Sequence, residues 1–174
     1  MNHSEHSTPS GLVYGLLLLG IVARLVPHPW NATPLTAIAL FGGVYLSKRW
    51  AIVLPLGIVA VSDIALGWHT TMPFTWGTFA IIGMLAWWVR SHLSVARIAA
   101  GSLAGSTLFF LVTNFGVWLT QALYPHTAGG LWQCYMAGVP FFRNALVGDL
   151  VYTAALFGLY AFASARRPAT ITAR

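Results

Sequence analysis

The sequence predicts an all-α membrane protein with six transmembrane helices and both termini in the cytoplasm. Six apolar stretches cover most of the chain, at 11–27, 34–47, 50–67, 72–90, 97–124 and 139–164. One side of these stretches carries most of the basic residues, namely Lys48, Arg49, Arg90, Arg97, Arg166, Arg167 and Arg174, whereas Arg24 and Arg143 belong to the other side. Because cytoplasmic loops are enriched in Lys and Arg, this alternation indicates an even number of crossings with both ends inside.

The composition supports the membrane class and a single domain. Only 7% of the residues are charged and 57% are hydrophobic, whereas about a quarter of a soluble domain is charged. A spanning helix needs about 20 apolar residues, so six helices fill residues 11–165, between a flexible N-terminus at 1–10 and a cytoplasmic tail at 166–174. The net charge of +6 comes from residues dispersed at helix ends. We interpret it as a topology signal with contacts to lipid headgroups, and not as a nucleic-acid surface.

The first three helices show distinct signals in order. The run at 11–27 has no preceding Lys or Arg and no cleavage site, so we expect a helix and not a signal peptide. The second helix begins with Thr33 as N-cap and Pro34 as the first helical residue. It is short, about 21 Å against a hydrocarbon thickness of about 30 Å, so a re-entrant segment is the alternative. Pro55 and Gly57 lie in the middle of the third helix, and Asp63 lies near its outer end.

The fifth helix begins with overlapping pairs of small residues, Ala100/Ala104 and Gly101/Gly105. Such spacing lets helix backbones approach closely. Either packing inside the bundle or docking of a membrane partner explains it. Between the helices, the segments 28–31, 69–76 and 126–143 are expected at the exterior.

Charged residues inside predicted spans are the first candidate site. Asp63 and Asp149 lie in spans together with Arg24 and Arg143, although a charge at membrane depth costs a few kcal/mol and usually faces the bundle interior. Two interpretations remain open. The charges tie helices together, or they join Asn114 as the polar floor of a pocket that opens outward.

A polar stripe on the fifth helix favours the pocket. Thr107, Asn114, Trp118 and Gln121 share one helical face, which we predict to face inward. Many external aromatic residues are equally typical of an interfacial belt. The predicted substrate-binding set is His28, Trp30, Asn31, Asp63, His69, Trp76, Asn114, Trp118, Gln121, Trp132, Tyr135, Arg143, Asn144 and Asp149.

Metal binding and catalysis are weaker interpretations. His28, His69, His126 and Cys134 lie on the outer side and have side chains that bind soft transition metals, but they lack the short spacing of a metal motif. No Gly-rich phosphate loop, nucleophile elbow or paired-carboxylate motif occurs. We therefore expect no metal, no cofactor and no enzymatic activity. A haem or metal membrane enzyme is a third alternative.

Several segments of the sequence resemble those of known families. Residues 24–31, 39–43, 62–63, 110–118 and 140–144, with Gly148-Asp149, resemble an uncharacterised family of small bacterial multi-spanning proteins. More loosely, the six-helix plan, Gly42-Gly43 and residues 62–67 resemble the S components of energy-coupling-factor vitamin transporters. That resemblance implies an outward pocket for a vitamin or metal, and an energising transmembrane subunit with ATPases as partner. S components meet that subunit through Ala-x-x-x-Ala on helices one and three, whereas this chain has Gly11/Gly15 on helix one and no such pair on helix three.

The leading hypothesis is a multi-pass protein of the bacterial inner membrane. It would bind a small vitamin- or cofactor-like nutrient for uptake, with the lipid bilayer and the substrate as its partners. The alternative from another class is a non-transporting accessory or structural subunit that docks a partner protein.

Overall fold

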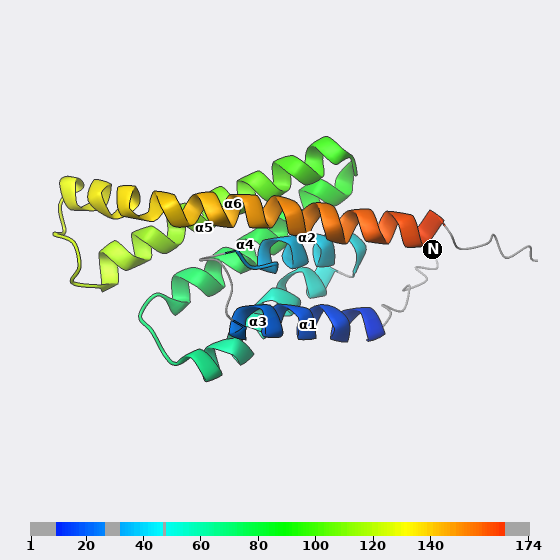
Figure 1. Cartoon of the computed structure of the whole chain (residues 1–174), viewed down its shortest axis with the longest axis horizontal. Coiled ribbons are helices and arrows are strands. Elements are labelled where there is room, and N and C mark those ends of the chain that lie inside the picture. The colour runs from blue at the N-terminus through cyan, green and yellow to red at the C-terminus, as the bar shows by residue number, and fades with distance from the viewer. Residues whose placement is uncertain (1–9, 27–31, 47, 166–174) are drawn as a thin grey trace, which may run out of the picture.

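The computed structural model describes residues 10–26, 32–46 and 48–165, and these residues form six α-helices (Figure 1). The helices are α1 (Ser10–Leu25), α2 (Leu35–Tyr45), α3 (Lys48–Leu66), α4 (Met72–Ser91), α5 (Val95–Thr120) and α6 (Ala128–Ala165). The predicted all-helical class and the number of helices are therefore confirmed. Successive helices run in opposite directions, so the start of α1 and the end of α6 lie at the same end of the molecule (Figure 1), as an even number of passes requires.

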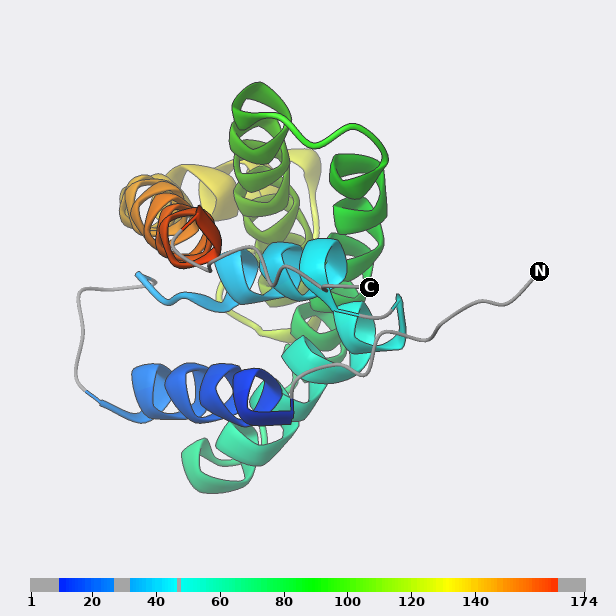
Figure 2. The ribbon, with the colours of Figure 1, turned by 90° about the vertical axis from the view of Figure 1, so that its right-hand side faces the viewer.

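Helix α2 lies at the centre of the bundle. It contacts each of the other five helices, and the end-on view shows it between α1 and α3 on one side and α4, α5 and α6 on the other (Figure 2). Every residue from Leu35 to Val44 is buried. A helix that is apolar on all sides belongs in an interior. The apolar composition of the short helix α2 therefore agrees with its central position.

Glycines set the closest helix contacts. A Cβ on Gly83 would lie 2.1 Å from the backbone oxygen of Ala51, and one on Gly105 would lie 2.8 Å from the side chain of Thr36. Gly101 and Gly105 of α5 are buried, whereas Ala100 and Ala104 are exposed. The glycine pair of α5 therefore packs inside the bundle, as the first of the two predicted explanations required.

Four helices are long and apolar enough to cross a membrane, namely α3, α4, α5 and α6. Helices α1 and α2 are apolar but shorter. Large apolar side chains also remain exposed on outer faces, such as Leu18, Val151 and Leu159, and a bilayer would cover such surfaces. These observations indicate a membrane protein, with the spanning role of α1 and α2 still a prediction.

The start of α6 differs from the prediction. The segment expected as an external loop up to residue 138 is helical from Ala128 onward, and Pro140 lies inside the helix. The missed signal is an N-cap, because Thr127 Oγ1 accepts a hydrogen bond of 3.1 Å from the backbone N–H of Gly130. With 38 residues, α6 is about 57 Å long and exceeds the hydrocarbon thickness of about 30 Å.

The start of α2 is also shifted by one residue. Pro34 takes the N-cap position without a side-chain cap, and Leu35 is the first helical residue. The predicted cap at Thr33 is therefore wrong. The carbonyl of Pro34 instead accepts the first helical hydrogen bond, 2.8 Å from the backbone nitrogen of Ile38.

Candidate functional site

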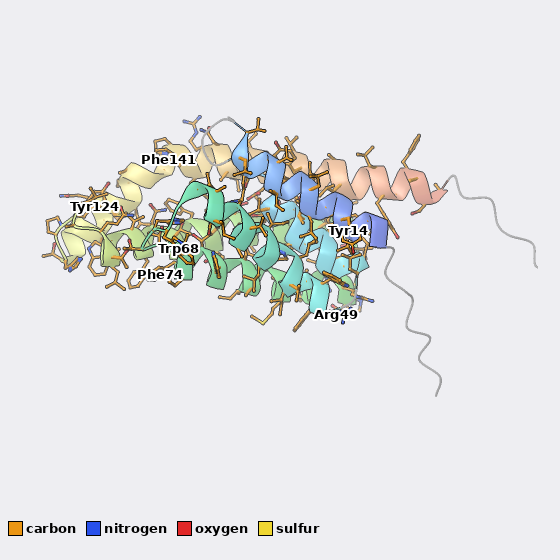
Figure 3. All side chains as sticks on the ribbon, turned by 90° about the horizontal axis from the view of Figure 1, so that it is seen from below. Tyr14, Arg49, Trp68, Phe74, Tyr124 and Phe141 are labelled. Atoms are coloured by element: carbon orange, nitrogen blue, oxygen red, sulfur yellow. The ribbon has the colours of Figure 1, made fainter. Side chains whose placement is uncertain are left out.

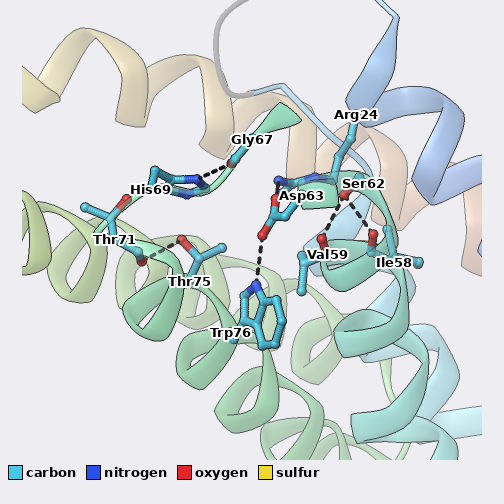
Figure 4. A network of polar contacts seen from close by, with 10 residues as sticks. All are labelled: Arg24, Ile58, Val59, Ser62, Asp63, Gly67, His69, Thr71, Thr75 and Trp76. Carbon is cyan, nitrogen blue, oxygen red and sulfur yellow. Dashed lines mark hydrogen bonds and ion pairs between the residues drawn. The ribbon is translucent and has the colours of Figure 1, made fainter. Parts of the chain in front are cut away.

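An ion pair and an indole join three helices near the C-terminal end of α3 (Figure 4). The guanidinium of Arg24 on α1 pairs with Asp63 Oδ1 on α3, and Trp76 Nε1 on α4 donates to Asp63 Oδ2 over 2.8 Å. The side chains of Asp63 and Arg24 are only 2% and 14% exposed. Both carboxylate oxygens therefore have a donor inside the protein, so this cluster resembles a structural tie between α1, α3 and α4.

The neighbouring polar side chains form hydrogen bonds with backbone carbonyls that are close in sequence. Ser62 Oγ donates to the carbonyls of Ile58 and Val59 on its own helix, at 2.7 and 3.1 Å. The ring of exposed His69 lies 3.2 Å from the carbonyl of Gly67 (Figure 4). Ser62 and His69 thus bond to backbone carbonyls close in sequence, and the cluster around the carboxylate of Asp63 consists of the ion pair and the indole.

A second buried polar cluster joins α2, α5 and α6. Asp149 Oδ2 accepts a hydrogen bond of 2.6 Å from Ser106 Oγ, and the side chain of Thr36 forms another hydrogen bond to this carboxylate. One turn away on both helices, Thr153 Oγ1 donates to Ser102 Oγ over 3.2 Å. All five side chains are buried. The structure thus places the two buried aspartates in separate clusters, and not around one shared cavity.

A cavity of about 150 Å³ lies between α5 and α6, beside the second cluster. It is lined by Ser106, Phe109, Phe110, Thr113, Asn114, Val117, Gly138, Phe141, Phe142 and Ala145. The missing side chain of Gly138 makes room here, because a Cβ would lie 2.5 Å from Asn114 Oδ1. Ser106 lines the cavity and also bonds to Asp149. The side chain of Ser106 therefore lies between Asp149 and the cavity.

Aromatic rings form much of the cavity wall. Phe110 and Phe142 stack across the α5–α6 interface with ring centroids 4.7 Å apart, and Phe109 meets Phe79 of α4 at 5.3 Å. Two residues of the predicted polar floor lie near this cavity. Asn114 and, through Ser106, Asp149 lie at one cavity, within an aromatic wall that sequence reasoning did not identify.

The other predicted residues of α5 lie beyond the cavity. Trp118 Nε1 donates to the carbonyl of Pro125 over 2.9 Å, and its ring meets that of His126 at 5.3 Å. Gln121 is the C-cap residue of α5. Thr107 is exposed, so its predicted inward orientation is wrong. Residues spaced by seven differ by only about 20° around a helix axis, so Thr107 shares the face of Asn114 but none of the described helices covers it at its level of α5.

The N-terminal half of α6 carries Trp132, Tyr135, Arg143 and Asn144, and the first two therefore lie on a helix and not on the predicted loop. Tyr135 OH donates to the carbonyl of Leu111 over 2.9 Å, which ties this half of α6 to α5. Trp132, Arg143 and Asn144 are exposed. His28, Trp30 and Asn31 fall outside the described residues.

The candidate metal ligands do not converge in the part of the chain that the structure describes, where no group of three His, Cys, Asp or Glu side chains is placed to hold a metal ion. Cys134 is buried, and its thiol donates to the carbonyl of Asn114 over 3.3 Å. His126 packs against Trp118. The thiol and the ring are therefore engaged in contacts between α5, α6 and their connecting segment.

Sequence reasoning missed Ser106 and Thr36, the partners of Asp149. The signal was present in the Ser102/Ser106 pair, because hydroxyls one helical turn apart on an apolar helix mark a face turned away from lipid.

Family comparison places the whole described bundle in one family. The model of a family of unknown function (DUF6580) matches residues 5–170. The chain belongs to this family. No curated protein and no solved structure matches the chain. The predicted membership of a family without an assigned activity agrees with this result, and the resemblance to S components stays a prediction.

Proposed function

We propose that this member of the DUF6580 family is a multi-pass protein of the bacterial inner membrane that binds a small vitamin- or cofactor-like nutrient for uptake. The observation that carries the proposal is the cavity between α5 and α6, where Ser106, Thr113 and Asn114 meet four phenylalanine rings. Small-molecule sites are typically concave and apolar with a few convergent polar groups. Polar side chains in spanning helices are costly and usually mark a functional position.

The position of the cavity along the helices supports an outward opening. Its residues on α5 run from Ser106, near the middle of the helix, to Val117, and all but Ser106 lie in the half remote from Arg97. Figure 3 shows Arg49 at one end of the bundle and Tyr124 and Phe141 toward the other. Because basic residues favour the cytoplasmic side, the cavity belongs to the periplasmic half, with both termini in the cytoplasm.

An energising partner has a suitable surface on α1. Gly11 and Gly15 are exposed, and a Cβ on either would meet nothing within 4 Å. Small residues at this spacing allow close approach of another helix. Uptake driven by a transmembrane subunit with ATPases would place the contact here, in place of the alanine pairs of S components.

The second candidate function, an accessory subunit that docks a partner protein, is favoured by a different observation. Asp63 receives donors from both Arg24 and Trp76 between helices, which is the arrangement of a scaffold and not of a carboxylate awaiting a ligand. Trp68 and Trp132, 83% and 64% exposed, would then contact the partner.

Mass spectrometry of detergent-purified full chain separates these two functions. Uptake predicts a stoichiometric small molecule that survives purification, and Asn114→Ala should weaken its retention about tenfold or more, the effect of one lost hydrogen bond in an apolar site. Thr107→Ala is the matched control, because this exposed threonine on the same helix bonds only to its own turn. A protein partner in stable complex, without any small molecule, would favour the accessory function.

A further inference from the structure

The polar groups of the α5–α6 cavity have already donated hydrogen bonds to the protein. Ser106 Oγ lies 3.0 Å from the carbonyl of Ser102 and 2.6 Å from Asp149 Oδ2, and its single hydrogen is donated to one of these two acceptors. Thr113 Oγ1 donates to the carbonyl of Phe109 over 2.7 Å. A hydroxyl has one hydrogen but two acceptor lone pairs. Both hydroxyls can therefore offer a ligand an acceptor and no further donor.

Asn114 adds a third acceptor. Its amide Nδ2 donates to the carbonyl of Phe110 over 2.8 Å, which fixes the orientation of the side chain. Oδ1 then points toward Gly138, where a Cβ would lie only 2.5 Å away. An alanine would crowd this oxygen, whereas glycine leaves it accessible from the cavity. The wall thus presents three acceptor oxygens, against one remaining donor, the second N–H of the Asn114 amide.

The charge around the cavity disfavours an anionic ligand. No Lys, Arg or His is among its described lining residues, and the carboxylate of Asp149 lies directly behind Ser106. A negatively charged ligand would lose its hydration here without gaining a counter-charge, which is costly in an apolar site. A cation would be attracted by the faces of the surrounding phenylalanine rings and, when Asp149 is ionised, by its carboxylate.

The size of the cavity limits the ligand further. A volume of about 150 Å³ is close to that of a cavity that takes up one benzene molecule. The stacked pair of Phe110 and Phe142 lines it on both helices, and aromatic rings prefer offset or edge contacts with other rings.

We propose that the cavity between α5 and α6 accepts a single-ring group that carries an N–H or O–H donor and is neutral or positively charged, and that it rejects carboxylates. This inference rests on the proposed function, because it assigns a ligand class to the same cavity. The donor of the ligand would bond to Asn114 Oδ1 or to the hydroxyl oxygens of Ser106 and Thr113. A larger nutrient would insert its ring and leave the remainder outside.

The test uses four ring probes on the full chain in detergent, with saturation-transfer NMR titrations. Benzyl alcohol supplies a neutral donor, benzylamine a cationic donor, toluene no donor and benzoate a negative charge. The leucine side chain of the variant Gly138→Leu would fill the cavity. Any signal that a probe gives with this variant therefore comes from probe dissolved in the detergent micelle and serves as the background. Gly158→Leu is its matched control, since a Cβ there meets nothing within 4 Å. If Gly138→Leu does not fold, Gly138→Ala serves instead.

We expect benzyl alcohol and benzylamine to bind the wild-type chain and Gly158→Leu, each about tenfold more tightly than toluene, the effect of one hydrogen bond. Benzoate should give no signal above that of Gly138→Leu. Benzoate that binds as tightly as benzylamine would overturn the charge preference, and toluene that equals benzyl alcohol would overturn the need for a donor. Silence of all four probes, with a native ligand still retained, would overturn the ring class and leave the proposed function standing. Silence without any native ligand would overturn both.

Discussion

Removal of the carboxylate of Asp63 should leave Arg24 buried without a counter-charge. Loss of one partner of a buried ion pair costs about 3–5 kcal/mol. Arg24 retains 14% exposure and can reach polar surroundings in part, so we expect the lower end, about 3 kcal/mol, for Asp63→Leu. That figure includes the hydrogen bond of 2.8 Å that Trp76 donates to the carboxylate. Replacement of both charges by leucine should cost less than the two single changes together.

A double-mutant cycle of Arg24→Leu and Asp63→Leu measures this coupling. Unfolding by titration with dodecyl sulfate in mixed micelles gives the free energies of the wild type, both single variants and the double variant. The coupling free energy should be about 1.5 kcal/mol or more, near the upper end for polar contacts in membrane helices. Additive costs, or an Asp63→Leu variant as stable as the wild type, would refute the structural role of the pair. Ligand retention should be unchanged in the double variant, because the pair lies outside the cavity lining.

Two further predictions concern packing and topology. Gly83→Val should destabilise the bundle by several kcal/mol through overpacking, because a Cβ at this position would lie 2.1 Å from the α3 backbone. Gly77→Val is the control, since a Cβ there would meet nothing within 4 Å. Equal unfolding midpoints for both variants would contradict the close contact between α3 and α4. In a Cys134→Ser background, Arg49→Cys and Trp68→Cys should react with a membrane-impermeant maleimide from opposite sides of the membrane, and labelling of both from one side would contradict the predicted orientation.

Much of the fold could be predicted because the composition, the positions of the charged residues and the residues that mark helix ends agree. Pro73 just inside α4 and Ser94 before α5 mark helix starts, and Ser94 Oγ accepts a hydrogen bond of 3.2 Å from the backbone N–H of Arg97. The basic residues at one side predicted successive crossings, and the helices do run in alternating directions (Figure 1), whereas the side of the membrane on which the termini lie stays a prediction. By contrast, the aromatic and glycine-rich segment after Thr127 suggested an external loop, although Thr127 itself caps α6.

The candidate site was predictable only in part, because the spacing of residues along one helix does not show which side chains of other helices they contact. Asp63 and Asp149 were identified as buried charges, but the sequence could not show that Arg24 pairs with the first and that hydroxyls from α2 and α5 satisfy the second. The position of Asn114 facing a cavity followed from the helical stripe. The phenylalanine wall did not, because apolar residues of a membrane helix face lipid or protein with the same chemistry.

Comparison of the small molecules retained by the wild type, Gly138→Leu and Gly158→Leu tests the proposed binding cavity most directly. The three proteins would be purified identically and analysed by native mass spectrometry. We predict an equal ligand adduct on the wild type and Gly158→Leu, and its loss from folded Gly138→Leu. The same adduct on all three proteins, or none on any of them, would contradict a ligand site between α5 and α6.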